Sequence, residues 1–292
     1  MEGNQRRRPR YKRTTSDDDL GLRLQDRDRE MLTLVYSYRF LSSQQIQRLV
    51  EGSDQVLLRR LQKLYHAGYL DRLKTSNNEA ILYALGNKGA DELTLHAGLD
   101  RGRIDWTAKN RAAGERYLAH ILMVGRFRET LTLAVRDRQG SALVAWRPEG
   151  RVADEVVIES GREGRAKAAI IPDGFFTLQD LADEMHFLLE CDRSTMTTRR
   201  YLEKMKAYWS FWKQAKHKSQ LGIESFRVLT VTKTEERKEN LRRITKEADD
   251  RKSGSPMFWF ASEARFSPEN PASIFAPIWQ SAKDDMWHHL LE

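Results

Sequence analysis

The chain has 292 residues and a formal net charge of +8, from 50 Lys and Arg against 42 Asp and Glu. This length suits two domains, and the positive excess favours a polyanionic partner, most often nucleic acid. No apolar run approaches the roughly 20 residues of a membrane span, and the single cysteine, Cys191, excludes an intrachain disulfide and a cysteine-rich zinc site. We therefore expect a cytoplasmic protein with no membrane partner.

Residues 1–25 are expected to form a basic arm that is disordered in isolation, because no apolar periodicity accompanies its charges. Two roles remain open for this arm. It is either a DNA-contacting segment, which tracks phosphates or enters a minor groove, or a solubilising tail. The basic side chains that would contact DNA include Arg6, Arg7 and Arg8.

Three helices and a hairpin are predicted next. Apolar spacing predicts a helix over residues 26–39, a short helix capped by Ser42 or Ser43, and a third helix over 55–70. Strand-like runs at 67–73 and 81–85 flank a polar turn. This order is typical of a winged helix-turn-helix domain, which we assign to residues 26–104. The alternative is a helical bundle with a surface hairpin and no DNA role.

The third predicted helix has two distinct faces. Its buried stripe is expected to contain Leu57, Leu61, Leu64 and Tyr65. Basic and amide side chains lie on the other face: Gln55, Arg59 and Lys63 are largely off the stripe, and Arg60 is at its flank. Such side chains contact base edges and flanking phosphates in a major groove, so we predict that these four residues bind DNA.

Residues 105–292 are predicted to form a second domain. The pattern predicts helices at 111–135, 197–216 and 236–251, and strands at 142–146, 168–178, 184–192, 226–232 and 257–262. A hairpin extension is expected around 156–160, and a C-terminal docking helix is expected to carry Trp279 and Trp287. This order favours an α/β sheet covered by helices on both faces.

Acidic residues follow two of these strands. Asp173 lies in a Pro-Asp-Gly at the end of one predicted strand, and Glu190 and Asp192 end the next. If the strands pair, the three carboxylates approach one another and would need a cation, for which oxygen ligands favour Mg²⁺ or Mn²⁺. The alternatives are an ordinary turn and a strand that emerges into solvent.

These motifs resemble the PD-(D/E)XK nuclease superfamily, whose core is a helix, three strands, a helix and a further strand. Asp173 and Glu190 match its two carboxylates, whereas Asp192 occupies the lysine position. The resemblance implies Asp173 and Glu190 as catalytic metal ligands, and the predicted cluster of three carboxylates adds Asp192 to this set. Lys204 on the following helix is the candidate replacement cation, with a surface lysine as its alternative. Whether the chain is an enzyme stays open.

The chain also resembles the replication-relaxation family of plasmids and mobile elements, through IIPDGFF, FLLECDRST and YLEKMKAY, over roughly residues 26–235. The resemblance implies an α/β protein, with a winged helix followed by a nuclease-like domain, that acts in replication and DNA relaxation. We expect a homodimer, associated with the nucleoid or a plasmid, that binds specific double-stranded DNA. If the nuclease-like domain is catalytic, it nicks or cleaves this DNA with Mg²⁺ or Mn²⁺. The alternative is a non-catalytic regulator whose nuclease-like domain is a scaffold for dimerisation or partner binding. An RNA-directed or protein-only adaptor fits the predicted wing less well.

Overall fold

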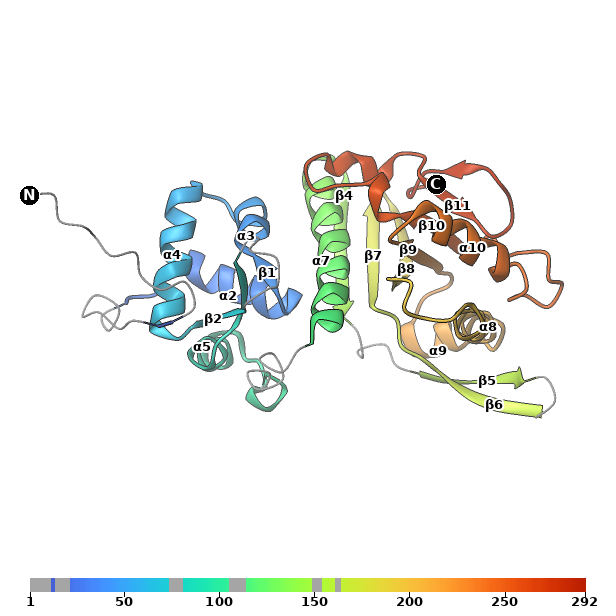
Figure 1. Cartoon of the computed structure of the whole chain (residues 1–292), viewed down its shortest axis with the longest axis horizontal. Coiled ribbons are helices and arrows are strands. Elements are labelled where there is room, and N and C mark those ends of the chain that lie inside the picture. Colours follow the sequence, from blue (N-terminus) through green and yellow to red (C-terminus); the bar gives the residue numbers. More distant parts are fainter. Residues whose placement is uncertain (1–11, 14–21, 74–80, 105–113, 149–153, 161–163) are drawn as a thin grey trace, which may run out of the picture. The chain divides into compact units, whose positions relative to one another are not determined.

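The chain divides into two compact units, Met1–Gly125 and Arg126–Glu292. The computed structural model describes residues 12–13, 22–73, 81–104, 114–148, 154–160 and 164–292 (Figure 1). Helix α7 (Glu115–Arg136) begins in the first unit and ends in the second. The predicted arm residues Arg6, Arg7 and Arg8 lie outside the described residues.

The first unit combines short helices with a small antiparallel sheet, in which the strand order is β1-β3-β2. Its elements are α2 (Asp26–Tyr38), β1 (Leu41–Ser42), α3 (Ser43–Leu49), α4 (Asp54–Ala67), β2 (Leu70–Leu73), β3 (Leu82–Leu85), α5 (Asn87–Ala97) and the 3-10 helix η1 (Arg101–Arg103).

Local sequence signals set the helix boundaries of this unit. Ser42 begins α3 with a capping box, in which its hydroxyl accepts from the Gln45 N–H and the Gln45 side chain accepts from the Ser42 N–H. Helix α4 ends at Gly68, whose φ of 89° is a left-handed conformation that glycine adopts readily. Leu57 and Leu61 of α4 are fully buried in the core. The predicted inward face of this helix is therefore the observed one.

The second unit is built on a seven-stranded mixed sheet with the order β12-β11-β10-β9-β8-β7-β4. Strands β8, β9 and β10 are parallel, and the remaining neighbours are antiparallel. Its elements after α7 are β4 (Ser141–Pro148), β5 (Asp154–Ser160), β6 (Gly164–Ile170), β7 (Gly174–Asp180), β8 (Asp183–Asp192), α8 (Thr198–Lys213), α9 (Lys216–Leu221), β9 (Arg227–Thr232), α10 (Glu235–Thr245), β10 (Phe258–Ser262), η3 (Glu263–Arg265), η4 (Pro271–Phe275), β11 (Trp279–Ser281) and β12 (Trp287–His288).

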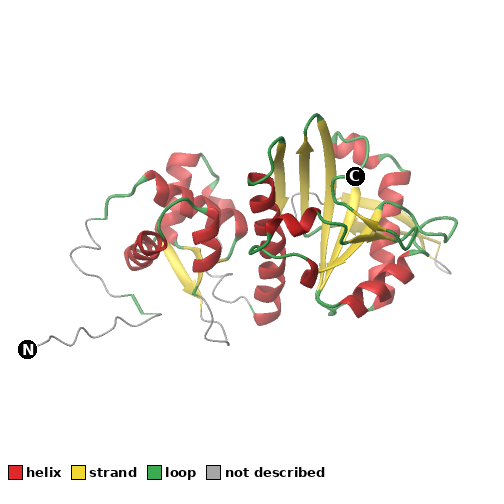
Figure 2. Ribbon diagram, turned by 90° about the horizontal axis from the view of Figure 1, so that it is seen from above, coloured by secondary structure: helices red, strands yellow, loops and turns green. Residues whose placement is uncertain are grey.

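Helices cover both faces of this sheet (Figure 2). On one face, Phe127 of α7 lies 5.7 Å from Phe176 of β7, centroid to centroid. On the other face, Tyr201 and Met205 of α8 pack into a cluster that also contains Leu188 of β8. Because side chains alternate along a strand, Glu190 and Asp192 lie on the same face as Leu188, beneath the helices that follow β8. The α/β class and the two covered faces agree with the sequence prediction.

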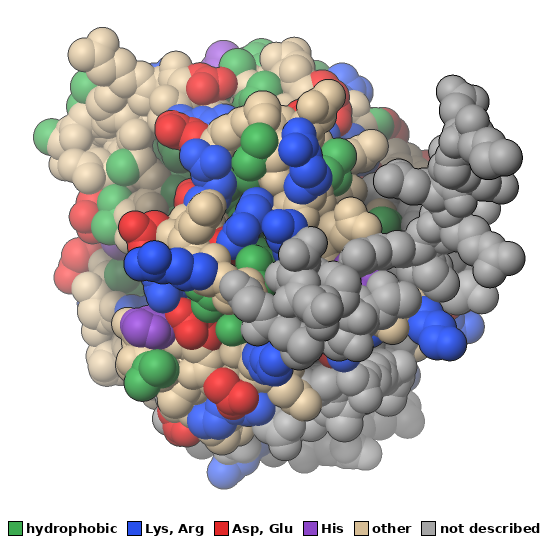
Figure 3. Space-filling model, turned by 90° about the vertical axis from the view of Figure 1, so that its left-hand side faces the viewer, with side chains coloured by type: hydrophobic (Ala, Val, Ile, Leu, Met, Phe, Trp, Pro, Cys, Tyr) green, Lys and Arg blue, Asp and Glu red, His purple; other side chains and the backbone are tan. Residues whose placement is uncertain are grey.

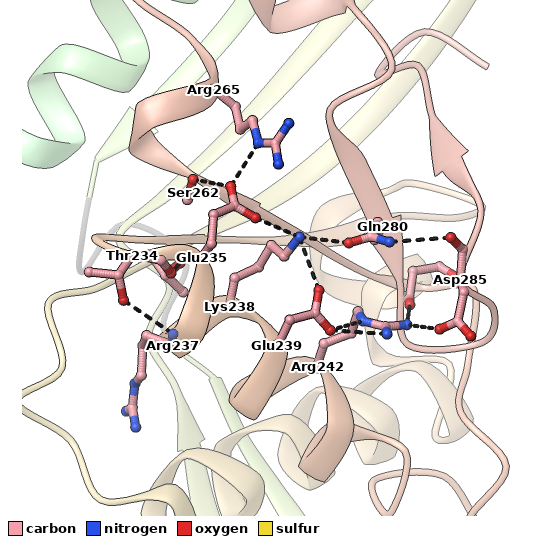
Figure 4. Close-up of polar contacts among 12 residues, drawn as sticks. Thr234, Glu235, Arg237, Lys238, Glu239, Arg242, Ser262, Arg265, Gln280 and Asp285 are labelled. Atoms are coloured by element: carbon pink, nitrogen blue, oxygen red, sulfur yellow. Dashed lines mark hydrogen bonds and ion pairs between the residues drawn. The ribbon is translucent and has the colours of Figure 1, made fainter.

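A buried lysine ties helix α10 to the C-terminal strands (Figure 4). The Lys238 Nζ donates to Gln280 Oε1 of β11 at 2.6 Å. The same ammonium lies 2.9 Å from a Glu235 oxygen, 3.1 Å from a Glu239 oxygen and 4.6 Å from the Trp287 ring centroid. A buried cation is tolerated when it is paired and hydrogen-bonded in this way. These contacts tie α10 to strands β11 and β12 of the sheet.

Two predicted elements differ from the structure. The strand predicted at 168–178 is two strands, because β6 pairs with β5 in a separate two-stranded sheet and the chain turns at Pro172 and Asp173 before β7 enters the main sheet. The predicted docking helix is instead strand β11, which pairs with β10, followed by the edge strand β12, and Trp279 of β11 is fully buried. No helix of the described chain is long and apolar enough to cross a membrane.

Candidate functional sites

The start of β7 lies beside the end of β8. Gly174 is opposite Leu189 in the antiparallel pair, so Asp173 is placed next to Glu190. The Asp173 N–H donates to the Leu189 carbonyl oxygen at 2.9 Å, and Asp173 Oδ2 accepts from the Cys191 N–H at 2.7 Å. Asp173 is thus bound to the backbone on both sides of Glu190, through its own N–H on one side and its carboxylate on the other. The Pro-Asp-Gly begins a main-sheet strand rather than ending one.

Glu190 is contacted by two side chains of α8. Lys204 Nζ donates to Glu190 Oε2 at 2.5 Å, and the Tyr208 hydroxyl donates to Glu190 Oε1. Residues four apart share one face of a helix, so α8 presents both donors to one carboxylate. Burial raises the pKa of Glu190 to about 7, although Lys204 lowers it, and the Asp173 charge raises it further. Lys204 therefore lies where the sequence placed the replacement cation.

Asp192 is held by an arginine that the sequence analysis did not single out. Arg237 of α10 binds both carboxylate oxygens, with Nε 2.8 Å from Oδ1 and an Nη 3.0 Å from Oδ2. The same Nη donates to the Met196 carbonyl oxygen at 2.7 Å, and Oδ1 also accepts from the Ser194 N–H at 2.8 Å. Arg237 thus contacts both ends of the segment that connects β8 to α8. Its position in a charged helix gave no signal of this contact.

Two carboxylates remain as candidate metal ligands. The part of the chain that the structure describes contains no group of three or more His, Cys, Asp or Glu side chains that could hold a metal ion. A joint site of Asp173, Glu190 and Asp192 is therefore not seen in this arrangement. Asp173 and Glu190 still fit Mg²⁺, which commonly binds one or two protein carboxylates and takes its other oxygens from water and substrate phosphates.

The outer face of α4 carries Gln55, Arg59 and Lys63, all exposed. Neither Arg59 nor Lys63 has an ion-pair partner among the described residues. Figure 3 views the molecule from the side of α4 and shows Lys and Arg side chains gathered there, with hydrophobic side chains between them. The predicted polar and basic surface of this helix is therefore open to a ligand.

Arg60 is a correction to the predicted DNA-contacting set. Its Nε donates to Asp28 Oδ1 at 2.9 Å, and an Nη donates to Asp28 Oδ2. Asp28 of α2 is fully buried and also accepts from the Gln25 N–H at 2.7 Å. Arg60 thus joins α4 to α2 inside the unit, because it lies at the flank of the buried stripe. The sequence feature that could have indicated this contact is the acidic residue Asp28 in the first turn of α2.

Arg13 is a second basic residue that the sequence analysis did not separate from its neighbours. Its guanidinium donates to the carbonyl oxygens of Tyr65 and Leu70, each at 2.9 Å, and pairs with Asp71. It also lies 5.3 Å from the Tyr65 ring centroid. Arg13 of the predicted arm is thus docked where α4 joins β2.

Together the two units define an α/β protein, in which a small helical unit with an antiparallel sheet precedes a seven-stranded mixed sheet with buried carboxylates. A family model described as replication-relaxation matches residues 32–225, and the chain belongs to this family. No curated protein and no solved structure gives a significant match to the chain.

Proposed function

We propose that the chain is a sequence-specific double-stranded DNA-binding protein that acts in replication of a plasmid or mobile element. The replication-relaxation family suggests the process. The element order α2, β1, α3, α4, β2, β3, with a β1-β3-β2 sheet, supports a winged helix-turn-helix domain. In such a domain α4 is the helix that enters the major groove.

One observation carries the proposal. Arg59 and Lys63 are exposed on the outer face of α4 without a described counter-ion, whereas the adjacent Arg60 is used inside the unit. Cations kept free on one helix face can replace the counterions that condense on DNA phosphates. The neighbouring amide of Gln55 adds the hydrogen-bonding capacity that pairs with adenine.

The test compares an Arg59→Ala, Lys63→Ala variant with the wild-type chain in duplex binding at several salt concentrations. Loss of two phosphate contacts should weaken binding and reduce the slope of log affinity against log salt by about 2. An Arg243→Ala, Arg251→Ala variant makes the same charge change at exposed positions of the second unit and is the control. Equal binding by the wild type and the α4 variant would contradict the role of α4.

A second candidate function is metal-assisted hydrolysis of a DNA phosphodiester in the second unit. The position of Asp173 beside Glu190, where β7 begins and β8 ends, and the 2.5 Å contact of Lys204 with Glu190 favour it. The order α7, β4, β7, β8, α8, β9 supports a nuclease-like core. A Mg²⁺ ion bound by Asp173 and Glu190 would lower the pKa of a water molecule and neutralise phosphate charge. Lys204 would orient that water and offset charge on the phosphate.

Supercoiled plasmid provides the test of this activity. The wild-type chain with Mg²⁺ or Mn²⁺ should convert it to nicked or linear DNA, and Asp173→Asn or Glu190→Gln should abolish the conversion. Each variant must retain wild-type duplex binding, which shows that it folds and reaches DNA. No conversion by a wild-type chain that binds DNA would favour the alternative, a regulator whose second unit is a scaffold for dimerisation or a partner.

A further inference from the structure

Two large apolar side chains flank the polar stripe of α4. Val56 is 39% exposed and Leu58 is 43% exposed, whereas Leu57 and Leu61 of the same helix are fully buried. At 100° per residue, Val56 and Leu58 lie on opposite borders of the face, and the polar side chains lie between them. These central residues are Gln55, Arg59, Gln62 and Lys63.

The composition of this face distinguishes a base-reading surface from one that contacts phosphates alone. Phosphate contacts need only positive charge and hydrogen-bond donors, and give no reason for exposed Val and Leu side chains. Among base-edge features of the major groove, the thymine C5-methyl group is the apolar one, and apolar side chains contact it. Amides and arginine read the neighbouring bases.

The charge of the face argues against a protein surface as the occupant. Asp54, at the first turn, is the one acidic residue of α4. An apolar partner pressed onto Val56 and Leu58 would also remove Arg59 and Lys63 from water without supplying counter-charge, which is unfavourable. A DNA groove supplies apolar methyl groups and negative phosphates together.

We propose that Leu58 and Val56 determine sequence specificity by contacting thymine methyl groups in the major groove of the target duplex. The inference rests on the DNA-binding function proposed above and deepens it, since it names a base feature that the target contains. Target sites therefore carry thymines at the positions that face the two borders of α4.

The experiment replaces thymine with uracil, which removes the methyl group and leaves base pairing intact. The full chain first selects duplexes from a randomised pool, and each thymine of the selected site is then changed to uracil in turn. One lost methyl contact should weaken wild-type binding about fourfold. Leu58→Ala or Val56→Ala should weaken binding to the thymine duplex and remove the difference between thymine and uracil at one position. Leu95→Ala, at a side chain of α5 that is 76% exposed, is the matched control and should change neither.

Each outcome decides the matter. A selected site at which uracil never weakens binding, or at which both variants keep the full difference between thymine and uracil, overturns the inference and leaves DNA binding intact. A wild-type chain that enriches and binds no duplex overturns the DNA-binding function itself. Sedimentation measures the oligomeric state of each variant, and thermal melting measures whether it is folded. If Leu58→Ala or Val56→Ala changes the oligomeric state, the apolar pair belongs to a contact between copies of this chain and the inference fails.

Discussion

Arg59 and Arg60 are adjacent in the sequence and should respond to mutation in opposite ways. Arg60 binds both oxygens of Asp28, which is fully buried, and the side chain of Arg60 is itself 15% exposed. The hydrogen bonds to Asp28 raise the pKa of Arg60, so its guanidinium stays charged at all ordinary pH values. Arg60→Ala would leave a buried carboxylate that, among the described residues, keeps a hydrogen bond from the Gln25 N–H.

Loss of one partner from a buried ion pair destabilises a protein by about 3–5 kcal/mol. Because Arg60 retains some access to water and Asp28 keeps a backbone donor, we expect the lower end, about 3 kcal/mol. Arg59→Ala, at an exposed side chain, should change the free energy of unfolding by less than about 0.5 kcal/mol. DNA binding should show the reverse order, with a direct loss of affinity in Arg59→Ala and, at low temperature, little change in Arg60→Ala.

Urea unfolding followed by far-ultraviolet circular dichroism measures the first effect. With a dependence on urea of about 2 kcal/mol per molar, the midpoint of the transition of the first unit should fall by about 1.5 M in Arg60→Ala. An Asp28→Asn, Arg60→Met variant removes both charges and should recover part of the loss. Equal midpoints for Arg59→Ala and Arg60→Ala would refute the assignment of Arg60 to the interior.

Three further predictions concern the second unit. Arg237→Ala should lower the free energy of unfolding by about 3 kcal/mol, since Asp192 would lose both of its guanidinium contacts, whereas Arg243→Ala should change it little in the same urea experiment. Because the pKa of Glu190 is raised in the folded state, its protonated form contributes to the free energy of unfolding. This contribution is fully present below about pH 4.5 and is lost as pH rises through about 7. In EDTA, wild-type stability should therefore fall relative to Glu190→Gln over this window, and parallel pH curves would contradict the burial of an ionisable carboxyl. Gly174→Ala should destabilise by about 1–3 kcal/mol, because an added Cβ would lie 2.9 Å from the Trp146 ring; a thermal melt equal to wild type would show that the ring moves aside.

Local periodicity predicted much of the first unit. The stripe of Leu57, Leu61 and Leu64 is fully buried as expected, because burial on a helix repeats every three or four residues and depends on neighbours in the sequence. The same pattern could not show which of two adjacent arginines turns inward. That choice depends on Asp28, 32 residues away from Arg60.

The candidate site was predictable where strand pairing decides it. Asp173 and Glu190 follow from two strands joined by a short turn, and the antiparallel register brings them together. Arg237 was not predictable, since it is 45 residues from Asp192 and its helix has the composition of a solvated one. The position of the Pro-Asp-Gly was also misjudged, because alternation within a strand does not reveal that β6 pairs with β5 outside the main sheet.

The contacts of Lys238 with β11 and β12 show that the folded second unit extends beyond the residues that the family model matches. The family match ends at residue 225, before β9 begins, but β9 lies next to β8 in the sheet and α10 is tied to β11 and β12 through Lys238. A fragment cut at the family boundary would expose the edge of the strand that carries Glu190 and Asp192. An expression fragment that contains the carboxylates should therefore extend through β12, because the strands after residue 225 complete the sheet that holds Glu190 and Asp192. Comparisons between family members should include this segment as well.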